Sequence, residues 1–166
     1  SILDQAGLES ASAVIIRAKH SDAEVCDNYN LRIGLTIESL RPSVHTVVEC
    51  RNAENVPFFE RAGCDSVVCL SSLSGRMVVQ ELQDPGVAAI LGELASNQHG
   101  KQFYLFPIPK AGTLFVDLKA SFAKDGIVVI GIRRNGENHL LPEDGFAGQG
   151  DDLVISIATE RPSIAT

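Results

Sequence analysis

Three short apolar runs, separated by two helix-like segments, dominate the first seventy residues. The runs cover residues 11–18, 44–50 and 65–70, and the helical patterns cover residues 21–40 and 52–63. An alternation of three strands and two helices with short links favours a parallel sheet with right-handed crossovers. A solid apolar run such as residues 11–18 is typical of a strand covered on both faces. The pattern predicts an α/β fold with a partial doubly wound, Rossmann-like parallel sheet.

This sheet is expected to be incomplete, because three parallel strands leave an edge and much of each apolar face open to water. Doubly wound nucleotide-binding folds begin with a strand and a G-x-G-x-x-G turn, a motif that does not occur in this chain. Residues 1–10 are predicted to form a helix, as if the chain started midway through such a domain.

The second half of the chain follows a different pattern. Residues 71–100 contain two helical stretches broken at Asp84-Pro85-Gly86, where proline cannot continue the helical hydrogen bonds. Residues 102–109 are short and extended, residues 113–126 form an amphipathic helix that stops at Gly126, and Asn135-Gly136 indicates a hairpin. A last strand is predicted in residues 150–158. We place a domain boundary in the polar residues 96–102.

Composition argues against several functions. The formal charge is −7, and the 14 Lys and Arg residues form no basic run, so nucleic acid is not an expected partner. No apolar stretch approaches the ~20 residues needed to cross a bilayer. Residues 1–8 have neither a basic leader nor a long apolar stretch, which favours a cytosolic location.

The cysteines and serines do not indicate a zinc site or an enzyme. Cys26, Cys50, Cys64 and Cys69 form no C-x-x-C pair and accompany no His-x-x-x-His, so we expect free buried thiols. Ser74 precedes a glycine, but the G-x-S-x-G turn of a nucleophile elbow does not occur. No catalytic residue is therefore assigned, and we expect a protein that is not an enzyme.

The order of elements and the local motifs resemble the RCK (regulator of potassium conductance) family, whose two lobes are called TrkA-N and TrkA-C. In the first lobe, "VVECRNAENVPFF" and "ERAGCDSVVCLSSLSGRM" are similar to the strand, helix, Gly-Ala-Asp turn and strand that lead into the crossover helix. In the second lobe, "YLFPIPKAGTLFVDL" and "GIVVIGIRRNGENHLLPEDGFAGQGDDLVIS" are similar to the TrkA-C pattern, with its Gly-Ile-Arg-Arg strand, Pro-containing loop and Gly-Asp before the last strand.

The resemblance implies three parts. Residues 1–72 are the C-terminal half of a Rossmann-like lobe, residues 73–102 are crossover and dimerisation helices with a linker, and residues 103–166 are a small α+β, TrkA-C-like ligand-sensing lobe. In that family the helix after the third strand packs on a neighbouring subunit. The stretch "LSSLSGR" is therefore expected to start that helix, with its serines as a cap, rather than to cradle a phosphate.

The function implied is that of a regulatory, gating domain of a potassium channel or transporter, on the cytoplasmic side of the membrane. Its expected partners are a pore-forming membrane domain in the full-length protein and further copies of itself, as a homodimer or a larger ring. The alternative is a stand-alone nucleotide-fold protein, either a small-molecule-binding protein or an enzyme, whose glycine-rich half lies on another chain.

Ligands of open parallel sheets bind beyond the carboxyl ends of the strands. The residues expected there are Arg17, Lys19, His20, Glu49, Arg51 and Leu70. The cations could receive an anion such as a nucleotide phosphate, and the alternative is that Glu49 pairs with an arginine at a solvated strand end. The resemblance places a calcium site of the family at Arg17, Glu49 and Arg51, but two of these three are cations, so calcium is not expected. No cofactor is firmly implied, and a nucleotide or divalent cation stays open for the full-length protein.

Two further groups of residues are candidates for contacts. Acidic residues surround the turns of the second lobe and are either divalent-cation ligands or solvated turn residues; they are Glu137, Glu143, Asp144, Asp151 and Asp152. Their spacing matches no D-x-D-x-D-G loop. Apolar residues of the two central helices have no place in a half-sheet, and we expect them to form the dimer interface; they are Leu73, Met77, Val78, Leu82, Val87, Ile90, Leu91 and Leu94.

Overall fold

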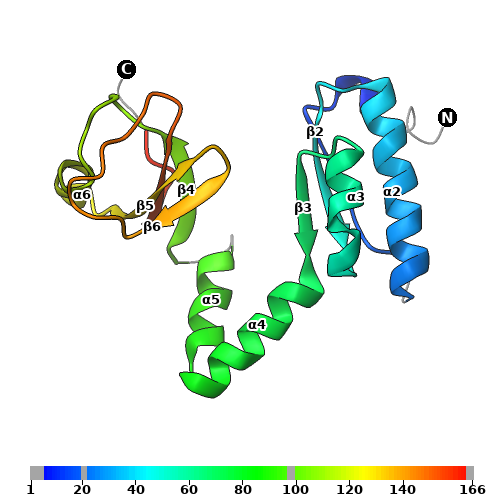
Figure 1. The fold of residues 1–166 in the computed structure, drawn as a ribbon, viewed down its shortest axis with the longest axis horizontal. Coiled ribbons are helices and arrows are strands. Elements are labelled where there is room, and N and C mark those ends of the chain that lie inside the picture. Colours follow the sequence, from blue (N-terminus) through cyan, green and yellow to red (C-terminus); the bar gives the residue numbers. More distant parts are fainter. Residues whose placement is uncertain (1–5, 20–21, 97–99, 164–166) are drawn as a thin grey trace. The chain divides into compact units, whose positions relative to one another are not determined.

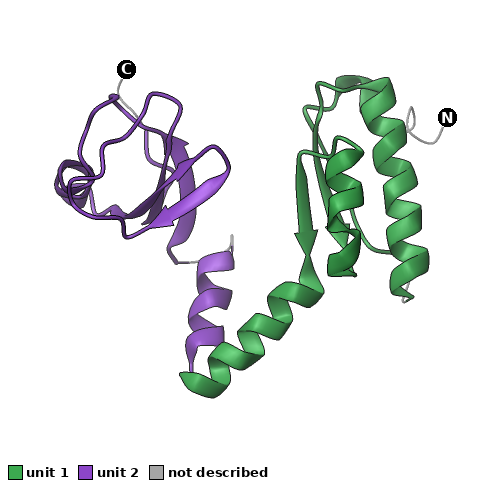
Figure 2. Cartoon of the chain, in the orientation of Figure 1, with its two compact units in different colours: residues 1–85 green, residues 86–166 purple. Residues whose placement is uncertain are grey.

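A computed structural model describes residues 6–19, 22–96 and 100–163 of the chain. The chain divides into two compact units, residues 1–85 and residues 86–166 (Figure 2). The division coincides with the predicted helix break at Asp84-Pro85-Gly86, whereas residues 97–99 of the expected boundary segment lie outside the described residues. The assignment of residues 1–72, 73–102 and 103–166 to three functional parts stays a prediction.

The first unit is built on a three-stranded parallel sheet. Its strands β1 (Ala13–Ile16), β2 (His45–Cys50) and β3 (Ser66–Cys69) lie in the order β1-β2-β3. Helix α2 (Ala23–Leu40) connects the first pair, and the short η2 (Ala53–Asn55) and α3 (Val56–Arg61) connect the second. The sequence-based prediction of a partial Rossmann-like parallel sheet is confirmed.

Local sequence explains where the first helices begin. The Asp22 side chain accepts a hydrogen bond from the Val25 N–H at 2.8 Å and caps α2; the alternative cap, Ser21, lies outside the described residues. The predicted helix over residues 1–10 is wrong for its described part, which holds only the single turn η1 (Leu8–Ser10). Gly7 has a φ of 74°, in the left-handed region, which a right-handed α-helix cannot include.

Within the described part of the first unit, helices cover one face of the sheet and not the other, which corrects the prediction for residues 11–18. Both α2 and α3 lie on the same side of the sheet (Figure 1), and the core there includes Ile16, Ile37 and Phe59. On the other face the side chain of Ile15 is 71% exposed and that of Val68 is 42% exposed. The prediction of a strand in this apolar run is confirmed, but alternate side chains of the strand are exposed to solvent.

Helix α4 (Leu70–Gln83) follows β3 directly and ends the first unit. None of its residues is buried. Helix α5 (Val87–Ala95) begins the second unit after Gly86, whose φ is 103°. The predicted pair of helices and the break between them are confirmed.

The second unit is a small α+β unit. Strands β4 (Gln102–Pro107), β5 (Val128–Arg134), β6 (Glu137–Leu140) and β7 (Leu153–Ala158) form an antiparallel sheet in the order β4-β7-β5-β6. Helix α6 (Phe115–Ala123) contributes Phe115 and Leu118 to a core shared with Ile132. The predicted hairpin is confirmed, because Asn135 and Gly136 both have positive φ, as a tight two-residue turn requires.

Two further sequence-based predictions concern the whole chain. All four cysteines are free thiols, and Cys26, Cys50 and Cys64 are buried, as predicted. Within the described ranges, every helix is too short or too polar to cross a membrane.

Candidate ligand-binding site

The carboxyl ends of β1 and β2 meet at the edge of the sheet where charged side chains were expected. Glu49 lies near the end of β2, and its carboxylate accepts a hydrogen bond from the Ala18 N–H at 3.0 Å, just beyond β1. Arg17 and Lys19 are exposed on this segment, and His20 lies outside the described residues. The structure therefore brings the ends of these strands together, while the ligand-binding role of these residues stays a prediction.

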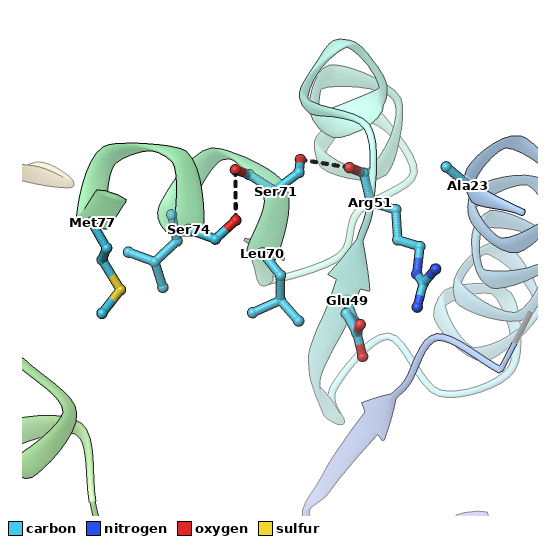
Figure 3. Close-up of a pocket in the computed structure, with 8 residues that line it drawn as sticks. Ala23, Glu49, Arg51, Leu70, Ser71, Ser74 and Met77 are labelled. Carbon is cyan, nitrogen blue, oxygen red and sulfur yellow. Dashed lines mark hydrogen bonds between the residues drawn. The ribbon is translucent and has the colours of Figure 1, made fainter. Parts of the chain in front are cut away.

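A cavity of about 590 Å³ opens at this edge and extends onto α4 (Figure 3). Of the residues expected at this edge it contains Glu49, Arg51 and Leu70, but neither Arg17 nor Lys19. The remaining walls come from the start of α2 and from the first turns of α4. The complete set of lining residues is Ala23, Glu49, Arg51, Leu70, Ser71, Leu73, Ser74 and Met77.

Apart from Leu70, the sequence did not predict that residues of α4 would form a wall of this site. Ser71 donates a hydrogen bond from its hydroxyl to the Arg51 carbonyl at 2.6 Å, which ties the first turn of α4 to the end of β2. Ser74 likewise donates to the Ser71 carbonyl at 3.1 Å (Figure 3). The cavity is thus shared by the sheet and by the helix that leaves it.

The serines were expected to cap this helix, and that expectation is wrong. Cys69 is the N-cap residue of α4, and the serines already lie inside the helix. Ser71 and Ser74 donate to backbone carbonyls instead. The expectation that the stretch starts a helix is confirmed, because α4 begins at Leu70.

Asp27 holds the loop that carries Arg51. This buried side chain, on α2, accepts hydrogen bonds from the Arg51 N–H at 2.8 Å, the Asn52 N–H at 2.9 Å and the Asn55 side-chain amide at 2.8 Å. Burial alone would raise the pKa of Asp27, but the hydrogen bonds from Asn55, Asn52, Arg51 and Cys50 outweigh it and lower the pKa. Asp27 therefore stays ionised and fixes the backbone at the cavity wall.

The chemistry of the cavity is mixed. The Arg51 guanidinium and the Glu49 carboxylate extend to the same side as the apolar side chains of Leu70 and Met77 (Figure 3). One wall therefore offers a cation and an anion, and the other offers apolar surface and hydroxyl groups. Such a site suits a ligand with an apolar ring and a charged group.

The acidic residues of the second unit do not converge on one point. Asp144 pairs with Lys119 at 2.6 Å, and Asp152 pairs with Arg134 at 2.6 Å. Glu143 and Asp151 are exposed. Among the residues that the structure describes, no group of three or more His, Cys, Asp or Glu side chains could hold a metal ion.

The residues predicted to form a dimer interface lie at or near the surface of their own units. Leu73, Val78 and Leu82 on α4 are 53%, 71% and 83% exposed, and Ile90 on α5 is 59% exposed. The other four, Met77, Val87, Leu91 and Leu94, are half-buried. Half of the predicted set is thus available for contacts outside the unit.

Family models match both halves of the chain. The TrkA-N domain model matches residues 1–70. The model described as "Castor and Pollux, part of voltage-gated ion channel" matches residues 71–166. Together with the parallel half-sheet and the helix that follows it, the first match defines the chain as an RCK domain, as its sequence motifs predicted. The second match covers more than half of the chain, which therefore belongs to the Castor and Pollux family.

Individual relatives are consistent with this assignment. The ion channel CASTOR of Lotus japonicus is 27% identical over 98% of this chain and 20% of the relative. The calcium-gated potassium channel TvoK of Thermoplasma volcanium is 23% identical over 98% of this chain and 48% of the relative. The chain therefore spans about a fifth of the length of the plant relative and about half of the archaeal one.

A solved structure shares the fold. The human SLO3 gating ring superimposes with a TM-score of 0.73 over 96% of this chain and 34% of that chain. Its sequence identity is 19%, so this likeness shows the fold alone.

Proposed function

We propose that this chain is a gating domain that couples the binding of a small ligand to ion flux through a potassium channel or transporter. In the full-length protein it lies on the cytoplasmic side and is joined to a pore-forming membrane domain. Support comes from the RCK fold and from relatives that are named as ion channels, one of them a potassium channel. The same relatives favour this role over the alternative of a stand-alone nucleotide-fold protein, and we propose that the chain has no enzymatic activity.

The end of β2 and the first turns of α4 line the same cavity, and this shared lining is the main support for a gating role. Ser71 is both a lining residue and the residue that ties α4 to the Arg51 carbonyl. A ligand in contact with Arg51 and the first turns of α4 therefore changes the stability of that junction. It shifts the arrangement of α4 only by as much as it binds one arrangement better than the other.

Helix α4 is also the element best suited to transmit such a shift between subunits. Its exposed apolar residues Leu73, Val78 and Leu82 need cover that the first unit does not supply. A second copy of the chain supplies it in our proposal, as a homodimer or as part of a larger ring. An obligate interface of this kind buries ~2,000 Å² or more.

We propose a nucleotide-like ligand rather than calcium at this cavity. The guanidinium of Arg51 can bind a phosphate with two parallel hydrogen bonds, and the apolar side chains of Leu70 and Met77 can contact a base. A calcium ion requires six to eight oxygen ligands, and a guanidinium supplies none.

Calorimetry of the full-length protein with adenine nucleotides and with calcium tests this proposal. We expect a nucleotide to bind and Arg51→Ala to weaken it by at least about tenfold, because a hydrogen bond to a charged group contributes ~1.5–3 kcal/mol. Arg76→Ala is the matched control, since Arg76 is an exposed arginine of α4 outside the cavity. Equal losses in both variants, or calcium binding that Arg51→Ala leaves intact, would contradict the proposal. A pore-forming stretch of apolar helices upstream in the same reading frame further separates the channel role from the stand-alone alternative.

A further inference from the structure

Two cysteines face each other at the junction between the sheet and α4. Cys50 is the last residue of β2 and Cys69 the last residue of β3, and they are direct partners in the parallel register. Their side chains therefore point to the same face of the sheet. Neighbouring strands lie about 4.8 Å apart, within the Cα separation of about 4.4–6.8 Å that a disulfide requires. Both residues are free thiols in this structure.

The two thiols have opposite surroundings. Cys50 is fully buried, and its sulfur lies 3.5 Å from the Asp27 carboxylate and 3.0 Å from the Asn52 carbonyl, the two acceptors within reach of its single thiol proton. Burial, followed by the negative charge of Asp27, raises the pKa of Cys50 to about 12. Cys50 is therefore a protonated thiol that is shielded from reagents in solvent.

Cys69 is half-buried and lies at the N-terminus of α4. Its sulfur lies 3.3 Å from the Ser71 hydroxyl. Burial tends to raise the pKa of Cys69, but hydrogen bonds around its sulfur, among them those from the backbone N–H groups of Ser72 and Ser71, outweigh it and lower the pKa. A partly exposed thiol at a helix N-terminus is the kind that reacts as a thiolate.

We infer that Cys50 and Cys69 form a reversible disulfide, with a peroxide as the oxidant, that fixes the start of α4 to the end of β2. The strand register places the two cysteines side by side. The partly exposed Cys69 is the cysteine that attacks the peroxide, and the buried Cys50 is the resolving cysteine. In the reducing interior of a cell such a bond is transient and acts as a redox signal. The inference goes beyond the proposed ligand-gating function and does not require any ligand.

The reaction balances with hydrogen peroxide alone. The Cys69 thiolate attacks one peroxide oxygen, the O–O bond breaks, and Cys69 becomes a sulfenic acid while hydroxide leaves and takes a proton to form water. The Cys50 sulfur then attacks the Cys69 sulfur as the S–O bond of the sulfenic acid breaks, and the sulfenic hydroxyl leaves with the Cys50 proton as a second water. Two thiols lose two electrons, and one peroxide gains them.

A disulfide between Cys50 and Cys69 would strengthen the junction between β2 and α4, which a hydrogen bond forms in the reduced protein. The Ser71 hydroxyl and the Arg51 carbonyl, which join α4 to β2, come from residues adjacent or nearly adjacent to the two cysteines. The covalent bond would limit the movement of α4 relative to β2 at the same place.

Peptide mapping of the full-length protein after treatment with stoichiometric hydrogen peroxide tests the inference. A Cys64→Ser background is used, because Cys64 and Cys69 lie on the same tryptic peptide, residues 62–76. We expect a cross-linked species that joins this peptide to the one containing Cys50, is lighter than their sum by two hydrogens, and separates with dithiothreitol. In the same background, Cys50→Ser is expected to leave a Cys69 sulfenic acid that dimedone traps, whereas Cys69→Ser leaves Cys50 unmodified.

Three results would overturn the inference. They are oxidation of Cys69 to a sulfinic acid while Cys50 stays reduced, absence of the cross-linked peptide at any peroxide dose that modifies the protein, and equal oxidation of Cys50 in the Cys69→Ser variant. Hydrogen exchange in the first turn of α4 supplies a second readout. Exchange there should slow on oxidation and recover on reduction, and unchanged exchange would count against fixation of the helix.

Discussion

The guanidinium of Arg134 binds the buried carboxylate of Asp152 with two nitrogens. Its Nε lies 2.9 Å from Oδ1 and its Nη2 lies 2.6 Å from Oδ2. The same arginine stacks over the Phe146 ring, with 4.7 Å from Cζ to the ring centroid, and donates to the Ala147 carbonyl. One side chain at the end of β5 thus holds the loop that leads into β7. The second arginine of the Gly-Ile-Arg-Arg strand therefore has a structural role in the second unit.

Replacing Arg134 with methionine should destabilise the second unit, because it leaves the buried Asp152 carboxylate without its cation. Chemical denaturation measures the change in the free energy of unfolding. Arg133→Met is the matched control. The guanidinium of Arg133 donates a hydrogen bond to the Asn138 side chain at the surface, so this variant should change stability by less than about 1 kcal/mol. Similar losses of unfolding free energy in the two variants would show that the buried Asp152 carboxylate does not need the Arg134 guanidinium.

Gly131 permits the close approach of β5 and β6. A Cβ atom at this position would lie 2.5 Å from the His139 carbonyl oxygen, a backbone atom that cannot move without disturbing the hairpin. Gly131→Ala should therefore lower the stability of the second unit by about 1–3 kcal/mol. Gly145→Ala is the control, because nothing lies within 4 Å of a Cβ there, and thermal unfolding compares the two. If Gly131→Ala unfolds at the same temperature as the parent, β6 can move away from β5 without a loss of stability, which would contradict this prediction.

The stability of the first unit should fall in acid through Asp27. Hydrogen bonds hold the pKa of this carboxylate below its ordinary value of 3.8, despite burial, which raises it. A lowered pKa in the folded state contributes stability that is present above the ordinary value and is lost as the pH falls below it. Asp27→Asn should therefore reduce stability at neutral pH and flatten its dependence on pH below about 4.

Unfolding midpoints measured as a function of pH check this expectation. Glu60→Gln is the control, because it removes an exposed carboxylate from the same unit. An Asp27→Asn variant that retains the full acid dependence of the parent would show that other carboxylates determine it.

Local signals made most of the fold predictable from the sequence. The Asn135-Gly136 turn and the Pro85 break depend on backbone preferences of one or two residues, and both were placed correctly. Local signals did not predict which face of the parallel sheet the helices cover. The exposure of Ile15 depends on which side the crossover helices occupy, and an apolar run has the same appearance whether one face or two are covered.

The candidate site was predicted in part for a similar reason. Glu49 and Arg51 follow from the rule that ligands bind beyond the carboxyl ends of parallel strands, since β2 was located correctly. Ser71 and Asp27 act through contacts with residues 20 or more positions away in the chain, which no local pattern shows. The sequence offered one sign of the role of Asp27, namely a charged residue next to Cys26 within an expected helix. The structure shows that both side chains are buried.

Leu82→Glu should prevent self-association if α4 forms the interface between subunits. Leu82 is the most exposed large apolar residue of this helix, at 83%, and a carboxylate there would have to be buried against apolar surface in a dimer. We expect sedimentation to show monomers or aggregates for this variant and an intact dimer for Gln83→Glu, which adds the same charge at an exposed neighbouring position. An unchanged Leu82→Glu dimer would exclude this face of α4 as the interface, because a charge in the centre of an obligate contact cannot remain hydrated.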